Sequence, residues 1–84
     1  MLRTTIVSPE RTLYTGEAEK VFVPGAKGRF EILTGHAPIV SILAKGIVRC
    51  EGSGEPFEVA VNGGFVEVAR NEVSLCVECS AEEA

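Results

Sequence analysis

The sequence lacks aspartate, contains a single histidine, and has no apolar run long enough to cross a membrane. With no aspartate and no second histidine to assist it, His36 has no local partner for a metal site, and the nearby Thr34 and Ser41 form no recognised nucleophile motif. A membrane-spanning helix needs about 20 apolar residues. The start MLRTTIVSPE contains no apolar stretch of the length found in signal peptides. We expect a soluble chain that reaches a membrane only through a partner.

Concentrated charge and paired cysteines are also missing. The 8 basic residues are scattered among 12 acidic ones, and the formal net charge is -4. Nucleic-acid binding usually needs a clustered basic patch, so this class of partner is disfavoured. The 3 cysteines are an odd number, which fits a reducing compartment better than a secreted disulfide framework. With 84 residues, the chain should form one domain over residues 1–84, with a modest core that a partner could support.

Strand signals dominate what the sequence does contain. Glycine and proline interrupt it repeatedly, and no uninterrupted window has the helical period. Short runs rich in valine, isoleucine, leucine and phenylalanine recur about every eight to twelve residues, which is typical of an antiparallel sandwich or barrel. The tail 79–84 is predicted to fray. The predicted strands are Leu2–Val7, Thr12–Tyr14, Glu17–Val23, Arg29–Leu33, Ile39–Leu43, Gly46–Cys50, Phe57–Val61, Phe65–Ala69 and Glu72–Cys79.

Alternation along EVSLCVEC, residues 72–79, places Cys76 and Cys79 on opposite faces of a strand. Their sulfurs should diverge, which argues against a zinc site or a redox pair and favours Cys79 as a core residue. Asn62, Gly63 and Gly64 between two apolar runs predict a tight hairpin. We assign structural turns to Gly25, Gly28, Gly35, Pro38, Gly63 and Gly64.

Two further patterns resemble known sites only partly. The segment GAKG, residues 25–28, lacks the spacing and the helix of a phosphate-binding loop and is better explained as a hairpin turn. Lys20 invites comparison with the modified lysine of biotinyl or lipoyl domains, but it lies inside a predicted strand. No catalytic residue, cofactor or metal is therefore predicted. Two alternatives stay open: a small β carrier or ligand-binding module modified at Lys20 or Lys27, and a metalloprotein using Cys76, Cys79 and His36.

The stretch VPGAKGRFEILTGHAPIV, from Val23 to Val40, carries the most specific signal. Together with SPE, LYTGEAEKV and VNGGFVEV, it closely resembles the N-terminal domain of the F-type ATP synthase epsilon subunit over nearly the whole chain. The resemblance implies an all-β fold, a flattened sandwich of two antiparallel sheets with about nine or ten short strands. It also implies a non-catalytic rotor subunit in the central stalk of a proton-driven ATP synthase, which couples ion translocation to ATP synthesis.

The resemblance also implies partners and contact residues. The expected partners are the gamma subunit and the polar loops of the c-ring. The loop that carries Lys27, Arg29 and Glu31 is expected to face the c-ring. The gamma-facing residues are expected to include two that match by position and three from the apolar segment IVSIL: Ser8, His36, Ile39, Ile42 and Leu43.

Location and regulation follow from the same resemblance. We expect a peripheral position on the cytoplasmic face of the bacterial plasma membrane, reached through the c-ring. Epsilon subunits usually continue as a two-helix hairpin that can inhibit ATP hydrolysis. A chain that ends at Ala84 is expected to lack that inhibitory element.

Overall fold

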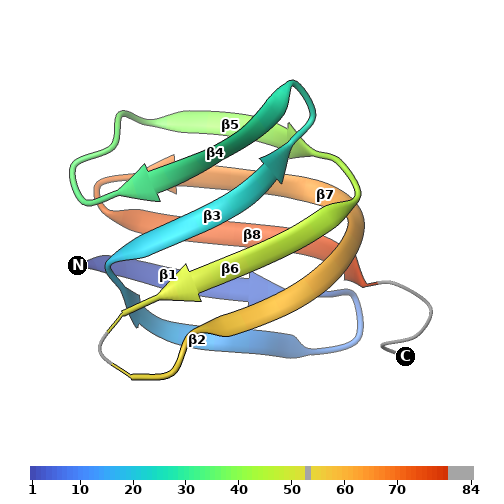
Figure 1. The fold of residues 1–84 in the computed structure, drawn as a ribbon, viewed down its shortest axis with the longest axis horizontal. Helices are drawn as coiled ribbons and strands as arrows, with labels where there is room; N and C mark the ends of the chain where they lie inside the picture. The colour runs from blue at the N-terminus through green and yellow to red at the C-terminus, as the bar shows by residue number, and fades with distance from the viewer. Residues whose placement is uncertain (53, 80–84) are drawn as a thin grey trace.

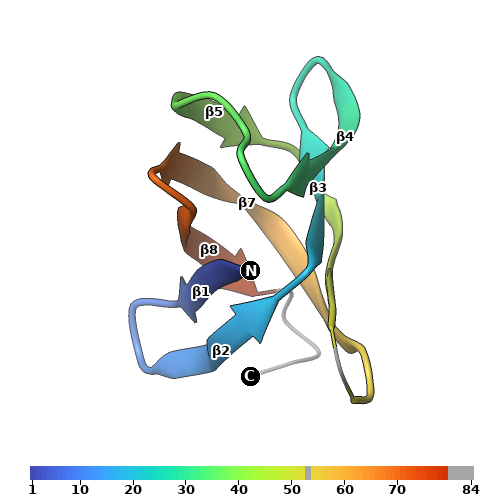
Figure 2. The same ribbon diagram turned by 90° about the vertical axis from the view of Figure 1, so that its left-hand side faces the viewer.

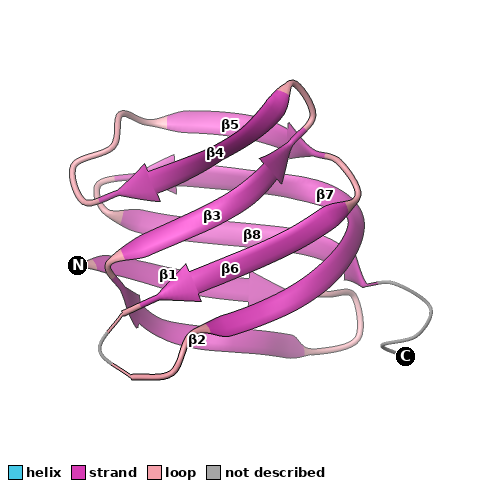
Figure 3. Cartoon of the chain, in the orientation of Figure 1, coloured by secondary structure: helices cyan, strands magenta, loops and turns pink. Residues whose placement is uncertain are grey.

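The computed structural model describes residues 1–52 and 54–79, and this part of the chain contains eight strands and no helix (Figures 1 and 3). It therefore contains no helix that could span a membrane. The tail predicted to fray spans residues 79–84. Residues 80–84 lie outside the described part, and Cys79 is the last residue of a strand. The strands are β1 (Leu2–Val7), β2 (Thr12–Ala18), β3 (Lys20–Gly25), β4 (Gly28–Leu33), β5 (Ile39–Leu43), β6 (Gly46–Glu51), β7 (Phe57–Ala69) and β8 (Glu72–Cys79).

The strands stack as two layers, which confirms the predicted all-β sandwich (Figures 1 and 2). One layer holds β4, β3, β6 and the first half of β7, and the other holds β5, the second half of β7, β8, β1 and β2. Hydrogen bonding continues from one layer to the other through β7, so both belong to one sheet. All pairs are antiparallel except β1 with β8, which are parallel.

Strand β7 explains why there are fewer strands than expected. The hairpin predicted at Asn62–Gly64 is wrong, because β7 runs unbroken through these residues with a bulge between Val61 and Gly63. The bulge inserts one residue and shifts the alternation, so that Val61 and then Val66 both point into the core. Glycine marks bulges as well as turns, so the same letters fit both structures.

Gly64 of β7 pairs with Val77 of β8, and its missing side chain faces the β8 backbone. Its φ of 138° is one that L side chains rarely adopt. A Cβ at this position would lie 2.1 Å from the carbonyl oxygen of Cys76 and 2.8 Å from the Cα of Val77. A side chain here would therefore push β8 away from β7.

The turn between β7 and β8 uses two residues that are not glycine. Arg70 has a φ of 53° and Asn71 a φ of 62°, which are the positive values that the favoured two-residue hairpin requires. The carbonyl of Asn71 accepts a hydrogen bond from the Arg3 amide at 2.8 Å. Its side-chain Oδ1 accepts another from the Gly35 amide at 2.7 Å. Asn71 thus links the start of β1 and the β4–β5 loop to this turn.

The core lies between the layers and is built from the inward residues of each strand. In β8 these are Val73, Leu75 and Val77, as the alternation predicts. Cys76 points away from the core, and Cys79 is half-buried on the core side. Each of the other seven strands also contributes to the core, and β2 does so only with its last residue, Ala18. These core residues are Leu2, Ile6, Ala18, Val21, Val23, Ile32, Leu43, Val48, Cys50, Val61, Val66 and Val68.

Candidate protein-docking surface

The outer face of the second layer carries an apolar row that crosses four neighbouring strands. Ile42 of β5 pairs with Phe65 of β7, Phe65 pairs with Cys76 of β8, and Cys76 pairs with Val7 of β1. Opposite residues on adjacent strands have Cβ atoms about 5 Å apart, so the four side chains form one continuous strip. Val40 extends the strip along β5. The exposed fractions are 70% for Val40, 64% for Ile42 and 41% for Phe65.

A polar row lies directly beside this strip. Val40 pairs with Glu67, Glu67 with Ser74, and Ser74 with Thr5. Single exposed apolar residues are common on soluble proteins, but a contiguous apolar strip with a polar border is typical of a surface that contacts another protein.

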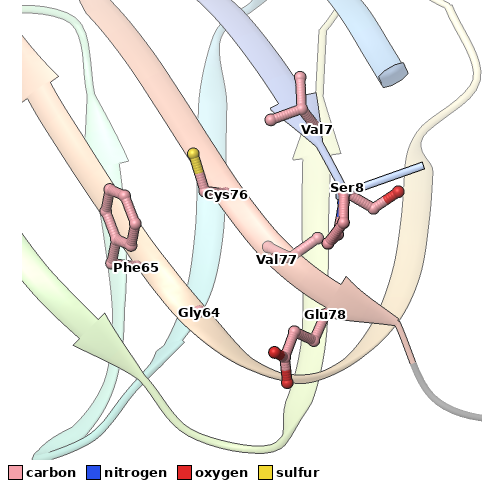
Figure 4. Close-up of a pocket in the computed structure, with 8 residues that line it drawn as sticks. Val7, Ser8, Gly64, Phe65, Cys76, Val77 and Glu78 are labelled. Atoms are coloured by element: carbon pink, nitrogen blue, oxygen red, sulfur yellow. The ribbon is translucent and has the colours of Figure 1, made fainter. Parts of the chain in front are cut away.

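A groove of about 470 Å³ lies at the β1 and β8 side of the strip. Figure 4 shows the Cys76 sulfur between Phe65 and Val7, with Ser8 beyond Val7 and Glu78 farther along the groove. Gly64 contributes only backbone to its lining. The groove therefore combines apolar walls with one exposed carboxylate.

A second groove, of about 760 Å³, lies on the other side of Ile42, between β5 and the β3–β4 turn. Lys27 is one of the two residues of that turn, and Arg29 and Glu31 point outward from β4. Lys27 and Arg29 line the groove beside Val40 and Ile42. The three charged residues predicted to face the c-ring thus lie on one exposed edge of the sandwich.

The structure separates the residues that the sequence grouped as gamma-facing. Ser8 lines the first groove, and Ile42 lies in the apolar strip. Leu43 is wrong as a surface residue, because it is only 4% exposed and belongs to the core. Ile39 is half-buried and packs against that core. In β5 the alternation directs residues 39, 41 and 43 inward and residues 40 and 42 outward.

His36 lies at the opposite end of the sandwich from Ser8. Its loop is hydrogen-bonded to Asn71, and Asn71 also accepts a hydrogen bond from the amide of Arg3, near the start of β1. Ser8 comes directly after the last residue of β1. At about 3.3 Å per residue, Arg3 and Ser8 are roughly 17 Å apart. A standard protein contact, with about 800 Å² buried per partner, is wide enough to reach both ends, so the gamma-facing role of His36 and Ser8 together stays a prediction.

The His36 side chain is hydrogen-bonded to the backbone of its own loop. Its Nδ1 lies 2.7 Å from the carbonyl oxygen of Ala37, and because a carbonyl only accepts, Nδ1 carries the proton. The His36 amide donates to the Leu33 carbonyl at 3.0 Å. The ring centroid is 6.5 Å from that of Phe30. A role in binding gamma stays a prediction.

The cysteines and lysines offer no assembled reactive site. Burial raises the pKa of the Cys50 thiol from 9.0 to about 11, so it is a protonated core residue at neutral pH. In residues 1–52 and 54–79 no three metal-binding side chains come together. Lys20 lies in β3 away from any hairpin tip, whereas Lys27 is in the β3–β4 turn.

The first layer, formed by β4, β3, β6 and the first half of β7, has a different outer face. Arg49 donates to Glu51 from Nε at 2.7 Å and forms a second ion pair with Glu58. These are the ion pairs found within the described ranges. Because all three side chains are partly exposed, the pairs are expected to contribute little to stability. This cluster, in which the charged groups already pair with one another, is a weaker candidate for recognition than the apolar strip.

These features define a class of protein: a small β-sandwich whose most distinctive surface suits contact with another protein. The chain belongs to the family of ATP synthase delta/epsilon chain β-sandwich domains, whose model matches residues 1–84. It is 42% identical over 81 residues to the ATP synthase epsilon chain of Leptospira interrogans, covering 95% of this chain and 63% of that one. It is 38% identical over 76 residues to the epsilon chain of Synechococcus sp. strain JA-2-3B'a(2-13), covering 90% and 56%.

Solved structures share the fold. A chain in the Euglena gracilis mitochondrial ATP synthase, solved as OSCP/F1/c-ring, matches with a TM-score of 0.83 at 23% identity, covering 90% of this chain and 49% of that chain. A chain in the central stalk/c-ring of the Tetrahymena thermophila enzyme matches with a TM-score of 0.76 at 15% identity, covering 92% and 63%. The present chain thus spans 63% of the length of the Leptospira epsilon chain and 56% of the length of the Synechococcus epsilon chain.

Proposed function

We propose that this domain is a non-catalytic part of the central stalk of a proton-driven ATP synthase. There it binds the gamma subunit and the polar loops of the c-ring, so that ion translocation is coupled to ATP synthesis. Its expected position is peripheral, on the cytoplasmic face of the bacterial plasma membrane. The observation that carries the proposal is the exposed apolar strip on a member of the delta/epsilon family.

The gamma contact is proposed to centre on the strip formed by Val40, Ile42, Phe65, Cys76 and Val7. A stable protein contact usually buries more than about 1,000 Å² in total and has an apolar centre with a polar rim. A strip that spans four strands, bordered by Glu67, Ser74 and Thr5, has this arrangement. Leu43 is not part of this contact, because its side chain is in the core.

The c-ring contact is proposed to use the exposed edge that carries Lys27, Arg29 and Glu31. Solvent-exposed charges mainly set the association rate and register of a complex, and salt screens them. This contact should therefore depend strongly on ionic strength. The gamma contact should depend on it less, because its centre is apolar.

The test measures binding of the full chain to purified gamma subunit by isothermal titration calorimetry. Ile42→Asp places a charge at the β5 end of the strip, next to Phe65, and should weaken binding at least about tenfold. The matched control is Ile47→Asp, because Ile47 is 39% exposed on the outer face of the other layer, and it should bind as the wild type does. If the wild-type chain does not bind gamma at micromolar concentration in moderate salt, the proposal is wrong.

A second measurement addresses the c-ring. Lys27→Glu should reduce the amount of chain that remains on detergent-purified c-ring with gamma, and it should leave binding to gamma alone unchanged. Retention of Lys27→Glu at the wild-type level across a range of salt concentrations would exclude this residue from the c-ring contact.

A further inference from the structure

The groove beside the apolar strip has a shape and a charge that specify part of its partner. We infer that it accepts one bulky apolar side chain of the bound protein, next to a lysine or arginine that pairs with Glu78. This inference rests on the proposed function and adds to it which chemical feature the docking partner must present.

The shape comes from a position that cannot carry a side chain. Gly64 lines the groove, and a Cβ there would overlap the Cys76 carbonyl at 2.1 Å, so the close pairing of β7 and β8 keeps this position empty. Phe65 stands on one side and Val7 on the other, with the Cys76 sulfur between them (Figure 4). The resulting volume of about 470 Å³ is within the range of clefts that bury small ligands, about 300–1,000 Å³. It therefore has room for a large apolar side chain.

The charge comes from Glu78. Its side chain is exposed in the groove lining, and it forms no ion pair with any residue in the described ranges, where Arg49 makes the two pairs that occur. A carboxylate at the edge of an apolar contact favours a partner with a nearby cation and disfavours an acidic one. Glu67, in the polar row, adds a second negative charge beside the strip.

The same charges argue against other occupants. A second copy of this chain would bring its own Glu67 and Glu78 to the contact, and like charges in close apposition are unfavourable. The groove also continues into the strip through Phe65, which pairs with Ile42 of β5. The apolar surface therefore extends well beyond the groove. A surface of this extent is better matched by another protein than by a free small molecule.

The test compares two β8 variants in the titration with gamma. Glu78→Lys should weaken binding at least about tenfold, and added salt should partly restore the affinity, because it screens a repulsion where the wild type has an attraction. Glu72→Lys makes the same charge change at the opposite end of the same strand, where Glu72 is the first residue of β8 and does not line the groove. It should bind within about twofold of the wild type.

A labelling experiment probes the apolar part without altering the fold. In a Cys79→Ser background, the thiol that solvent reaches is that of half-buried Cys76, since Cys50 is buried. Bound gamma should slow maleimide labelling of Cys76 at least about tenfold.

A second variant fills the groove. Cys76→Phe should weaken gamma binding, while its circular dichroism spectrum stays that of the wild type.

The outcomes separate this inference from the proposed function. If wild-type chain binds gamma but Glu78→Lys binds equally well and Cys76 labels at the free rate, the inference is overturned and the proposed function stands. If the wild type does not bind gamma, both fall. A dimer of the chain alone that Glu78→Lys abolishes would assign the groove to a second copy and would also overturn the inference.

Discussion

Replacing Gly64 with alanine tests the close approach of β7 and β8 directly. The added Cβ would lie 2.1 Å from the Cys76 carbonyl oxygen, whereas ordinary contact begins at 3.4 Å, so the β8 backbone would have to move by about 1.3 Å. Both strands are paired on their other edges, β7 with β5 and β8 with β1. The displacement is therefore resisted from both sides.

The expected loss has two parts. Holding a residue other than glycine at a φ of 138° costs about 1–3 kcal/mol. Moving β8 also weakens one or two ladder hydrogen bonds, each worth about 0.5–1.5 kcal/mol net, and loosens the packing of Val77. The free energy of unfolding should thus fall by about 3–5 kcal/mol. A domain of this size has a total stability of about 4–13 kcal/mol.

Urea denaturation followed by circular dichroism measures this loss. With a slope of roughly 1.5 kcal/mol per molar urea, the midpoint should decrease by about 2–3 M. Gly28→Ala is the matched control, because Gly28 has a nearly equal φ of 135° with nothing within 4 Å of its added Cβ. It should show only the backbone cost. Equal losses for the two variants would refute the overlap as the cause.

Three further predictions concern the turns and the core. Arg70→Gly should raise the free energy of unfolding by about 0.5–1 kcal/mol, because relief of the positive φ exceeds the added chain entropy of glycine; a lower urea midpoint would contradict this. Asn71→Gly keeps the turn but removes the Oδ1 acceptor, so the Gly35 amide should exchange hydrogen at least about tenfold faster, whereas Asn71→Asp, which keeps an acceptor, should not change its rate in the same NMR experiment. Cys50 has a pKa raised by burial from 9.0 to about 11, so its contribution to stability is complete below pH 9 and should be lost as the pH rises toward 11; urea midpoints measured across that range should decline less for Cys50→Val.

The sequence predicts the strands that alternate regularly and the faces of their residues. In β8 the positions of Val73, Leu75 and Val77 follow from period-two alternation alone, and so does the divergence of Cys76 and Cys79. The all-β class follows from the frequent glycine and proline breaks. These are local properties of the chain, which is why local patterns are sufficient to predict them.

The bulge in β7 and the faces of β5 depend on neighbouring strands. Glycine-rich letters at 62–64 fit a hairpin or a bulge equally well. Pairing with β6 before these residues, with β5 after them and with β8 throughout is what keeps the strand continuous. In IVSIL both faces are apolar, so alternation separates the two sets but does not say which is inward. The burial of Leu43 against the other layer settles it.

The apolar strip could not be read from the sequence. Val7, Ile42, Phe65 and Cys76 are far apart along the chain, and they adjoin only through the registers of three strand pairs. One of these pairs is parallel, and a parallel pair joins strands with a long connection between them. The charged edge at Lys27, Arg29 and Glu31 is easier to predict, because one short hairpin carries all three.

The parallel pair of β1 with β8 has a consequence for how the chain is made. Strand β1 lies between β2 and β8, so during synthesis one flank of the first strand stays without a neighbour until the last strand has left the ribosome. Contacts this distant in sequence make folding slow and expose strand edges meanwhile. A nascent chain stalled before residue 72 should therefore remain vulnerable to proteases, even with β1 to β7, all the strands that precede β8 in the described ranges, already complete.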